Sequence, residues 1–187
     1  MRQRWVLVAM GAWIAGSISM SVVATENFYT IDRLLASSPD PTFARAVRQL
    51  GQPQARDLLR YLSSELNRLY FQMWNAAQLP LGATALWLII GRTRPDPRST
   101  RAARAVVVML AIVLLMLVWL TPAIVSLGRT LDFVPRDPAP PGMPRFWILH
   151  GAYTSLELIK LAIGILAATW IARAPDVPEP VSGAVRL

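Results

Sequence analysis

The sequence predicts an all-α fold: a polytopic membrane four-helix bundle with both termini in the cytoplasm and an amphipathic helical excursion between the first two helices. Composition is the first reason, because 54% of the 187 residues are hydrophobic, 16% are charged and the mean hydropathy is +0.40. The second reason is that the apolar residues fall into four long blocks. A hydrocarbon core of about 30 Å requires roughly 20 apolar residues of helix, and each block reaches that length.

The chain length fits a single domain, and we expect one membrane domain over residues 1–187. Proline and small residues dominate the carboxyl-terminal segment, which favours poor order there. The expected parts are membrane spans at 5–25, 66–91, 104–127 and 146–172, an extramembrane helical segment at 26–65, and a flexible tail at 173–187.

The first span, Trp5–Ala24, follows a basic amino end and resembles a signal peptide. Its apolar run is longer than the roughly 7–15 residues of a signal-peptide core, so we expect a retained helix. Gly11, Ala15 and Ser19 recur at four-residue spacing, with Gly16 beside them. Small residues at this spacing favour close approach of another helix.

The longest polar segment contains a short amphipathic helix at Pro41–Leu50. Phe43 and Val47 lie on one face of this helix, and Arg45 and Arg48 lie on the other. Helices of this kind lie in the membrane interface, with the apolar face toward the acyl chains. We therefore expect this helix to rest on the membrane surface.

The second and third spans differ in character. Asn67, Trp74 and Gln78 share one face of the second span. Buried Asn and Gln between membrane helices usually hydrogen-bond to neighbouring helices, which is the main expectation, and a ligand-binding role is the alternative. The third span, Val106–Leu127, is almost uniformly apolar, so we expect it to face lipid over most of its surface.

The loop at 91–104 determines the predicted topology. It carries five arginines against the single acid Asp96. Positive charge in short loops marks the cytoplasmic side, and an even number of crossings places both termini on that side. We expect a multi-pass protein of the bacterial cytoplasmic membrane, with lipids as its surroundings.

The fourth span combines high apolarity with ionisable groups. His150, Tyr153, Glu157 and Lys160 recur at three- and four-residue spacing and share one helical face. Glu157 and Lys160 are three residues apart and can form an ion pair, which lowers the cost of burying either charge. His150 could ligate a haem iron or a chlorophyll magnesium, or it could hydrogen-bond to Glu157.

Several classes of chemistry are disfavoured by the residue inventory. The chain has no cysteine, so disulfides and thiolate sites cannot form, and its single histidine rules out bis-histidine haem within one chain. No Walker A, HExxH or GxGxxG pattern occurs. The net charge of +8 comes from arginines that flank apolar spans, which favours topology and lipid contact over nucleic acid. No catalytic constellation is evident, and we lean against an enzyme.

Three stretches of the chain resemble a known family. They are GAWIAG at Gly11–Gly16, the Arg56–Asp57 pair ahead of LNRLYFQMWNAAQLPLGA at Leu66–Ala83, and FWILHGAYTSLELIKL at Phe146–Leu161. On these motifs most of the chain resembles the uncharacterised four-helix membrane family that includes transmembrane protein 205. That family is similar in architecture to the copper-resistance CopD proteins and the HemJ-type protoporphyrinogen oxidases.

The resemblance implies the handling of haem, porphyrin or copper. The last span offers His150 and Lys160 for such a role. The other spans contain no histidine, and this departure puts metal transport and haem-dependent oxidation in doubt.

Three functions fit the sequence. The first is a small accessory or structural subunit of a larger respiratory, photosynthetic or transport complex, with other membrane-protein subunits as partners. The second is a protein that binds haem, porphyrin or chlorophyll, with His150 as the axial ligand. The other residues expected in that pocket are Tyr153, Glu157, Lys160, Asn67, Trp74 and Gln78. The third, weaker function is a small transporter with Glu157 and Lys160 in a polar path.

Overall fold

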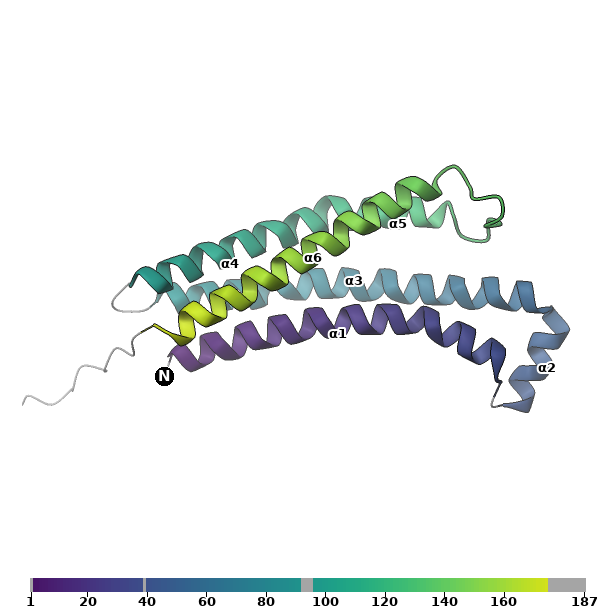
Figure 1. Ribbon diagram of the computed structural model, residues 1–187, viewed down its shortest axis with the longest axis horizontal. Coiled ribbons are helices and arrows are strands. Elements are labelled where there is room, and N and C mark those ends of the chain that lie inside the picture. Colours follow the sequence, from purple (N-terminus) through teal and green to yellow (C-terminus); the bar gives the residue numbers. More distant parts are fainter. Residues whose placement is uncertain (1, 39, 92–95, 175–187) are drawn as a thin grey trace, which may run out of the picture.

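The computed structural model describes residues 2–38, 40–91 and 96–174, and these residues form helices and connections with no strand. Figure 1 shows long helices that run side by side, with one short helix across one end. The helices are α1 (Arg2–Ala36), α2 (Pro41–Leu50), α3 (Gln52–Ile90), α4 (Pro97–Leu115), the π-helical turn η1 (Met116–Leu120), α5 (Thr121–Arg129) and α6 (Met143–Ala172).

Four of these helical stretches are long and apolar enough to cross a membrane: α1, α3, the continuous α4–η1–α5, and α6. Their number agrees with the four spans that the sequence predicts. The segment 26–65 is not separate from them, because α1 extends to Ala36 and α3 already begins at Gln52. At 1.5 Å per residue, α3 is about 58 Å long, nearly twice the hydrocarbon thickness. Most of the predicted tail, 175–187, lies outside the described residues.

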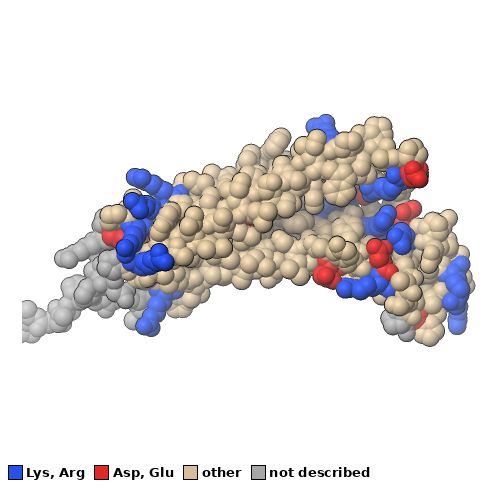
Figure 2. Space-filling view, viewed as in Figure 1, with Lys and Arg blue, Asp and Glu red and all other residues tan. Residues whose placement is uncertain are grey.

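The two ends of the bundle differ in shape and charge. The start of α1, the end of α3, the start of α4 and the end of α6 lie together at one end, and α2 and the α5–α6 connection lie at the other (Figure 1). Helix α1 pairs with α3 and α4 pairs with α6, and the two pairs diverge toward the end that carries α2. We call the end of the bundle where α1 begins the arginine end, and the opposite end the α2 end. The described cations of the arginine end are Arg4, Arg98, Arg101, Arg104 and Arg173. Figure 2 shows charged side chains gathered near both ends, with a long uncharged surface between them.

An apolar core closes the half of the bundle nearest the arginine end. Met10 of α1, Ala85 of α3, Val106 of α4 and Ile171 of α6 are all fully buried and belong to one cluster. The third span is therefore not uniformly lipid-facing. Its buried residues recur at three- and four-residue spacing, as one inward stripe of a helix must: Val106, Met109, Val113, Met116 and Leu120.

Close packing of α1 on α3 depends on Gly16. A Cβ atom at Gly16 would lie 2.1 Å from Cη2 of Trp74, so only glycine leaves room for that ring. The expected row of small residues is placed differently, because Gly11, Ala15 and Ser19 are exposed and a Cβ at Gly11 would meet no atom within 4 Å. The small residues of the first span do mark a close approach of another helix, but the contact is at Gly16 rather than at Gly11, Ala15 and Ser19.

Helix α2 begins with a well-formed cap. The Asp40 carboxylate accepts hydrogen bonds from the backbone N–H groups of Thr42, at 2.6 Å, and Phe43, at 3.1 Å, and Pro41 occupies the first helical position. On its apolar face, Val47 packs against a small cluster that includes Ile31 of α1. The predicted short helix at Pro41–Leu50 is confirmed, and it joins the extensions of α1 and α3.

Loss of the cap should loosen α2. The Phe43 and Thr42 N–H groups lower the pKa of Asp40 below its ordinary value of 3.8. The cap therefore stabilises α2 fully above that value and is lost as the pH falls through the lowered pKa. We expect Asp40→Ala at neutral pH, or acidification of the unmodified protein, to speed amide hydrogen exchange in the first turn of α2. Asp57→Ala, at an exposed acid of α3, is the control; equal effects from both variants would contradict the cap.

Gly16→Val should destabilise the bundle, whereas Gly11→Val should not. Overpacking against the Trp74 ring should cost about 1–3 kcal/mol of unfolding free energy. A side chain at Gly11 would meet no neighbouring atom, so Gly11→Val measures the effect of the Gly-to-Val change on helix propensity alone. The measurement is unfolding of the two variants in detergent, and equal losses would show that Gly16 is not a packing contact.

Candidate functional site

A buried ion pair occupies the middle of the bundle. The Nζ atom of Lys160 donates to Oε1 of Glu157 at 2.6 Å and also to Oε1 of Gln78. Lys160 is 1% exposed and Glu157 is 8% exposed. Glu157 lies midway along α6, and Lys160 is one turn nearer the end of the helix. The Glu157–Lys160 pairing predicted from the sequence is confirmed.

Gln78 connects this pair to the other helices. Its Oε1 atom also accepts from Nε1 of Trp13 at 2.8 Å, and its Nε2 atom donates to Oδ1 of Asn75 at 3.2 Å. Asn75 in turn donates from Nδ2 to Oγ1 of Thr121 at 2.9 Å, and it accepts from the Tyr153 hydroxyl at 3.3 Å. The connected residues form what we call the midplane network: Trp13, Asn75, Gln78, Thr121, Tyr153, Glu157 and Lys160.

The π-helical turn η1 lies directly before one member of this network. A single π-helical turn inside an α-helix changes the register of the residues that follow, and such turns recur at functional sites. Thr121 is the first residue after η1, is 4% exposed, and is followed by Pro122, which has no N–H to donate. The π-helical turn therefore ends directly before Thr121, the residue whose hydroxyl accepts the hydrogen bond from Asn75.

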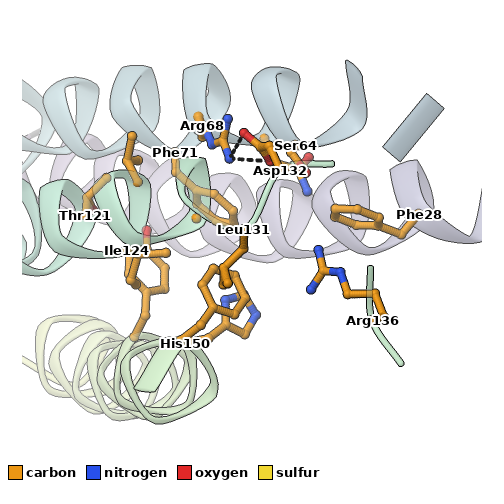
Figure 3. Close-up of a pocket in the computed structure, with 15 residues that line it drawn as sticks. Phe28, Ser64, Arg68, Phe71, Thr121, Ile124, Leu131, Asp132, Arg136 and His150 are labelled. Atoms are coloured by element: carbon orange, nitrogen blue, oxygen red, sulfur yellow. Dashed lines mark hydrogen bonds and ion pairs between the residues drawn. The ribbon is translucent and has the colours of Figure 1, made fainter. Parts of the chain in front are cut away.

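A cavity of about 130 Å³ lies between the diverging helices at the α2 end. Figure 3 shows side chains from α1, α3, α5, α6 and the α5–α6 connection directed into it. Thr121 and Tyr153 belong both to the cavity wall and to the midplane network, so the cavity ends at the network. The lining residues are Phe28, Ser64, Asn67, Arg68, Phe71, Thr121, Ile124, Val125, Gly128, Leu131, Asp132, Arg136, Phe146, His150 and Tyr153.

Two arginines in the cavity wall differ in their partners. Arg68 donates from Nη2 to both carboxylate oxygens of Asp132, at 3.0 and 2.9 Å, and from Nη1 to Glu65. This pairing joins α3 to the α5–α6 connection, and a tilted ring contact between Tyr61 and Phe133 joins the same two elements. Arg136 donates to the sulfur of Met143 at 3.3 Å, and no carboxylate of the described residues lies within ion-pair distance of it. Figure 3 shows its guanidinium directed toward the cavity.

The residues predicted for a cofactor site are divided among different roles. His150 lines the cavity, with its ring stacked on Phe146 at 5.9 Å, and Glu157 bonds to Lys160 rather than to it. Asn67 borders the cavity and links α3 to α1 by accepting from Asn27 at 2.6 Å. Trp74 packs on Gly16 and is in neither the cavity wall nor the network.

Tyr153, Glu157, Lys160 and Gln78 are brought together, as their shared faces predict. Asn75, Trp13 and Thr121 were missed as partners, although the three-residue spacing of Asn75 and Gln78 is a signal that could have found the first. The Arg68–Asp132 ion pair joins residues 64 positions apart and has no local signal.

Within the described residues, no group of three or more His, Asp and Glu side chains is placed to hold a metal ion. Comparisons with family models, with curated proteins and with solved structures find no match to this chain. The fold and the site therefore define its class: a helical protein with four candidate membrane spans, a polar network midway along them and a cavity that opens at one end. The resemblance to the transmembrane protein 205 family stays a prediction.

Removing one partner of the buried ion pair should be worse than removing both. Lys160→Met leaves the Glu157 carboxylate buried without its cation, which should cost about 3–5 kcal/mol of unfolding free energy. The double variant Lys160→Met with Glu157→Gln removes both charges and should recover part of that loss. The measurement is thermal or denaturant unfolding in detergent, and a double variant as unstable as the sum of the two single variants would contradict the pairing.

Proposed function

We propose that this chain is a multi-pass membrane protein that binds a single-chain amphiphile, with the anionic head of the ligand in the cavity at the α2 end. The observation that carries the proposal is a mostly apolar cavity with a cation, Arg136, at its mouth and no described carboxylate paired to it. No catalytic constellation accompanies the cavity in the described residues, so we propose binding rather than catalysis.

The walls favour a ligand that is itself partly apolar. Most lining side chains are aromatic or aliphatic, and the few polar groups are placed at separate points, as in typical small-molecule sites. The volume of about 130 Å³ is below the roughly 300–1,000 Å³ of sites that enclose a whole drug-sized ligand. The cavity therefore suits a head group and the first few methylene groups of a longer molecule, with the rest of the chain in the lipid.

The charges favour an anionic head. Arg68 is already neutralised by Asp132 and Glu65, and it closes the α3 side of the cavity. Arg136 is exposed at the mouth, where it can form a charge-assisted hydrogen bond to a sulfonate, phosphate or carboxylate oxygen. Ser64 and His150 line the same cavity and can add neutral hydrogen bonds.

The positive charges at the arginine end favour one orientation of the chain in the membrane. We propose that it faces the cytoplasm of a bacterial cell, because Arg4, Arg98, Arg101 and Arg104 flank the spans there and positive charge marks the cytoplasmic side. Both termini then lie inside, and the cavity opens toward the opposite face of the cytoplasmic membrane.

Two of the functions expected from the sequence, tetrapyrrole binding and an accessory-subunit role, have less support. The volume of about 130 Å³ does not fit a tetrapyrrole. The His150 ring stacks on Phe146 at 5.9 Å and meets Trp147 edge-to-face at 6.0 Å, so haem or chlorophyll ligation is not favoured. An accessory-subunit role stays a prediction, because the exposed apolar side chains of the four spans are equally suited to lipid.

Binding of decyl sulfonate tests the proposal. Calorimetric titration into the protein in nanodiscs of zwitterionic lipid should show saturable binding of decyl sulfonate and little binding of decyltrimethylammonium. Arg136→Gln should weaken decyl sulfonate binding about tenfold, the loss expected for one hydrogen bond to a charged group. Arg145→Gln is the matched control, since Arg145 is exposed outside the cavity lining and carries the same charge.

Two results would contradict the proposed function. One is an equal loss of affinity from Arg136→Gln and Arg145→Gln, which would indicate general electrostatic attraction rather than a site. The other is unchanged binding in Ile124→Trp, because an indole at that position of the wall should fill the cavity.

A further inference from the structure

Four helix–helix seams surround the cavity at the α2 end, and contacts between the helices close three of them. The α1–α3 seam is closed by hydrogen bonds: Nδ2 of Asn27 donates to Oδ1 of Asn67 at 2.6 Å, and Nδ2 of Asn67 donates to the carbonyl oxygen of Ala24 at 3.0 Å. An ion pair between Arg56 and Asp32, at 2.9 Å, joins the same two helices nearer α2. Helices α1 and α3 therefore form one continuous wall of the cavity.

The next two seams lie on either side of α5. Arg68 of α3 donates to Asp132 at 2.9 Å, and Asn75 of α3 donates to Thr121 at 2.9 Å, so polar contacts close the α3–α5 seam at both of its ends. The α5–α6 seam is closed by apolar packing in one cluster, whose members from these two helices are Ile124, Leu149, Tyr153 and Leu156. A ligand chain that left the cavity along either side of α5 would have to break these contacts.

The fourth seam, between α1 and α6, has no such closure at the α2 end. The hydrogen bonds that join these helices lie at the arginine end, where Nε2 of Gln3 donates to the carbonyl oxygens of Ile171, at 2.9 Å, and Ala174, at 3.4 Å. At the α2 end, no hydrogen bond or ion pair among the described residues joins α1 to α6. The helix pairs diverge there (Figure 1), and Phe28 of α1 and His150 of α6 both line the cavity.

The surroundings of this seam suit a hydrocarbon chain. Exposed side chains close in sequence to Phe28 and His150 are apolar on both helices: Val22 and Val23 on α1, and Trp147 and Ile148 on α6. Apolar side chains on the outside of membrane spans contact the acyl chains of the lipid. Figure 3 shows Arg136 directed into the cavity from the side on which Phe28 lies. The cation for the head group is therefore on the same side of the cavity as the open seam.

We propose that the α1–α6 seam is a lateral portal, through which the hydrocarbon chain of the bound amphiphile passes into the lipid while its anionic head stays at Arg136. The inference rests on the proposed function and defines its ligand more closely. A chain that leaves through the side of the bundle keeps its apolar surroundings when the head binds. The ligand is then an amphiphile that resides in the leaflet at the α2 end, rather than a dissolved anion.

Photolabelling with two dodecyl sulfonates tests the path of the chain. One probe carries a diazirine next to the sulfonate, and the other carries it at the middle of the chain. Each probe is irradiated with the protein in nanodiscs of zwitterionic lipid, with and without an excess of decyl sulfonate, and the labelled residues are identified by mass spectrometry. Only labelling that decyl sulfonate suppresses is counted, because labelling by probe in the bulk lipid does not saturate.

The position of the diazirine should determine which elements are labelled. We expect the head-proximal probe to label all the elements that line the cavity, including α5 and the α5–α6 connection. The mid-chain probe should label α1 and α6 alone, around Phe28 and His150. At probe concentrations below saturation, this labelling should fall about tenfold in Arg136→Gln, in line with the weaker binding of the head. Arg145→Gln is the matched control and should retain it.

Two labelling patterns would overturn the portal. Suppressible mid-chain labelling along the α3–α5 or the α5–α6 seam would show that the chain leaves by a different side of the bundle. Mid-chain labelling confined to the cavity wall at Ile124 and Val125 would show that the chain folds back inside the cavity.

The outcomes separate the portal from the proposed function. Saturable calorimetric binding of decyl sulfonate, with suppressible mid-chain labelling absent or located away from the α1–α6 seam, overturns the portal and leaves the proposed function standing. Absence of both saturable binding and suppressible labelling overturns the proposed function, and the portal with it.

Discussion

The burial of the Lys160 ammonium among four helices that are long and apolar enough to cross a membrane is the constraint on which the rest of the structure depends. An ionised group at that depth is tolerated only when it faces protein and finds partners. Glu157 supplies the counter-charge, and Gln78 supplies a second acceptor. Gln78 is then fixed by Trp13 on α1, and its amide fixes Asn75, so one buried charge holds residues from every span in a single hydrogen-bonded arrangement.

The network divides the bundle into two unlike halves. Toward the arginine end, apolar side chains from all four spans are fully buried, and the helices stay close together. Toward the α2 end, the helix pairs diverge, and the space between them holds the cavity rather than a packed core. The Arg68–Asp132 ion pair ties α3 to the α5–α6 connection across this opening, and the α1–α6 side has Phe28, His150 and Arg136 at the cavity. A cavity confined to one half of the bundle, with Thr121 and Tyr153 of the midplane network in its wall, follows from this asymmetry.

Local patterns in the sequence were sufficient for the helices, the number of spans, the α2 helix and the Glu157–Lys160 pair, because all of these depend on periodicity and neighbours within one turn. The third span has no polar residue between Val106 and Leu120, so its buried stripe at Val106, Met109 and Val113 could not be assigned. The partners of Gln78 on α1 and of Asn75 on α5 are 65 and 46 residues away, and only the packing of the helices brings them together. Asn67, His150 and Tyr153 line the cavity and belong to the pocket expected from the sequence, whereas the rest of its wall depends on helix divergence, which has no local signal.

The most direct test of the one-sided arrangement is cysteine accessibility, because the chain contains no cysteine of its own. Ile124→Cys places a thiol in the cavity wall. Val113→Cys places one in the apolar core nearest the arginine end, where the native side chain is fully buried. A membrane-impermeant maleimide, applied to each face of sealed vesicles of known orientation, reports which thiols reach water. We expect Ile124→Cys to react only from the side of the vesicle membrane where the α2 end lies, and Val113→Cys to react from neither side. Reaction of Val113→Cys from the side of the arginine end, or of Ile124→Cys from both sides, would contradict a cavity that opens only at the α2 end.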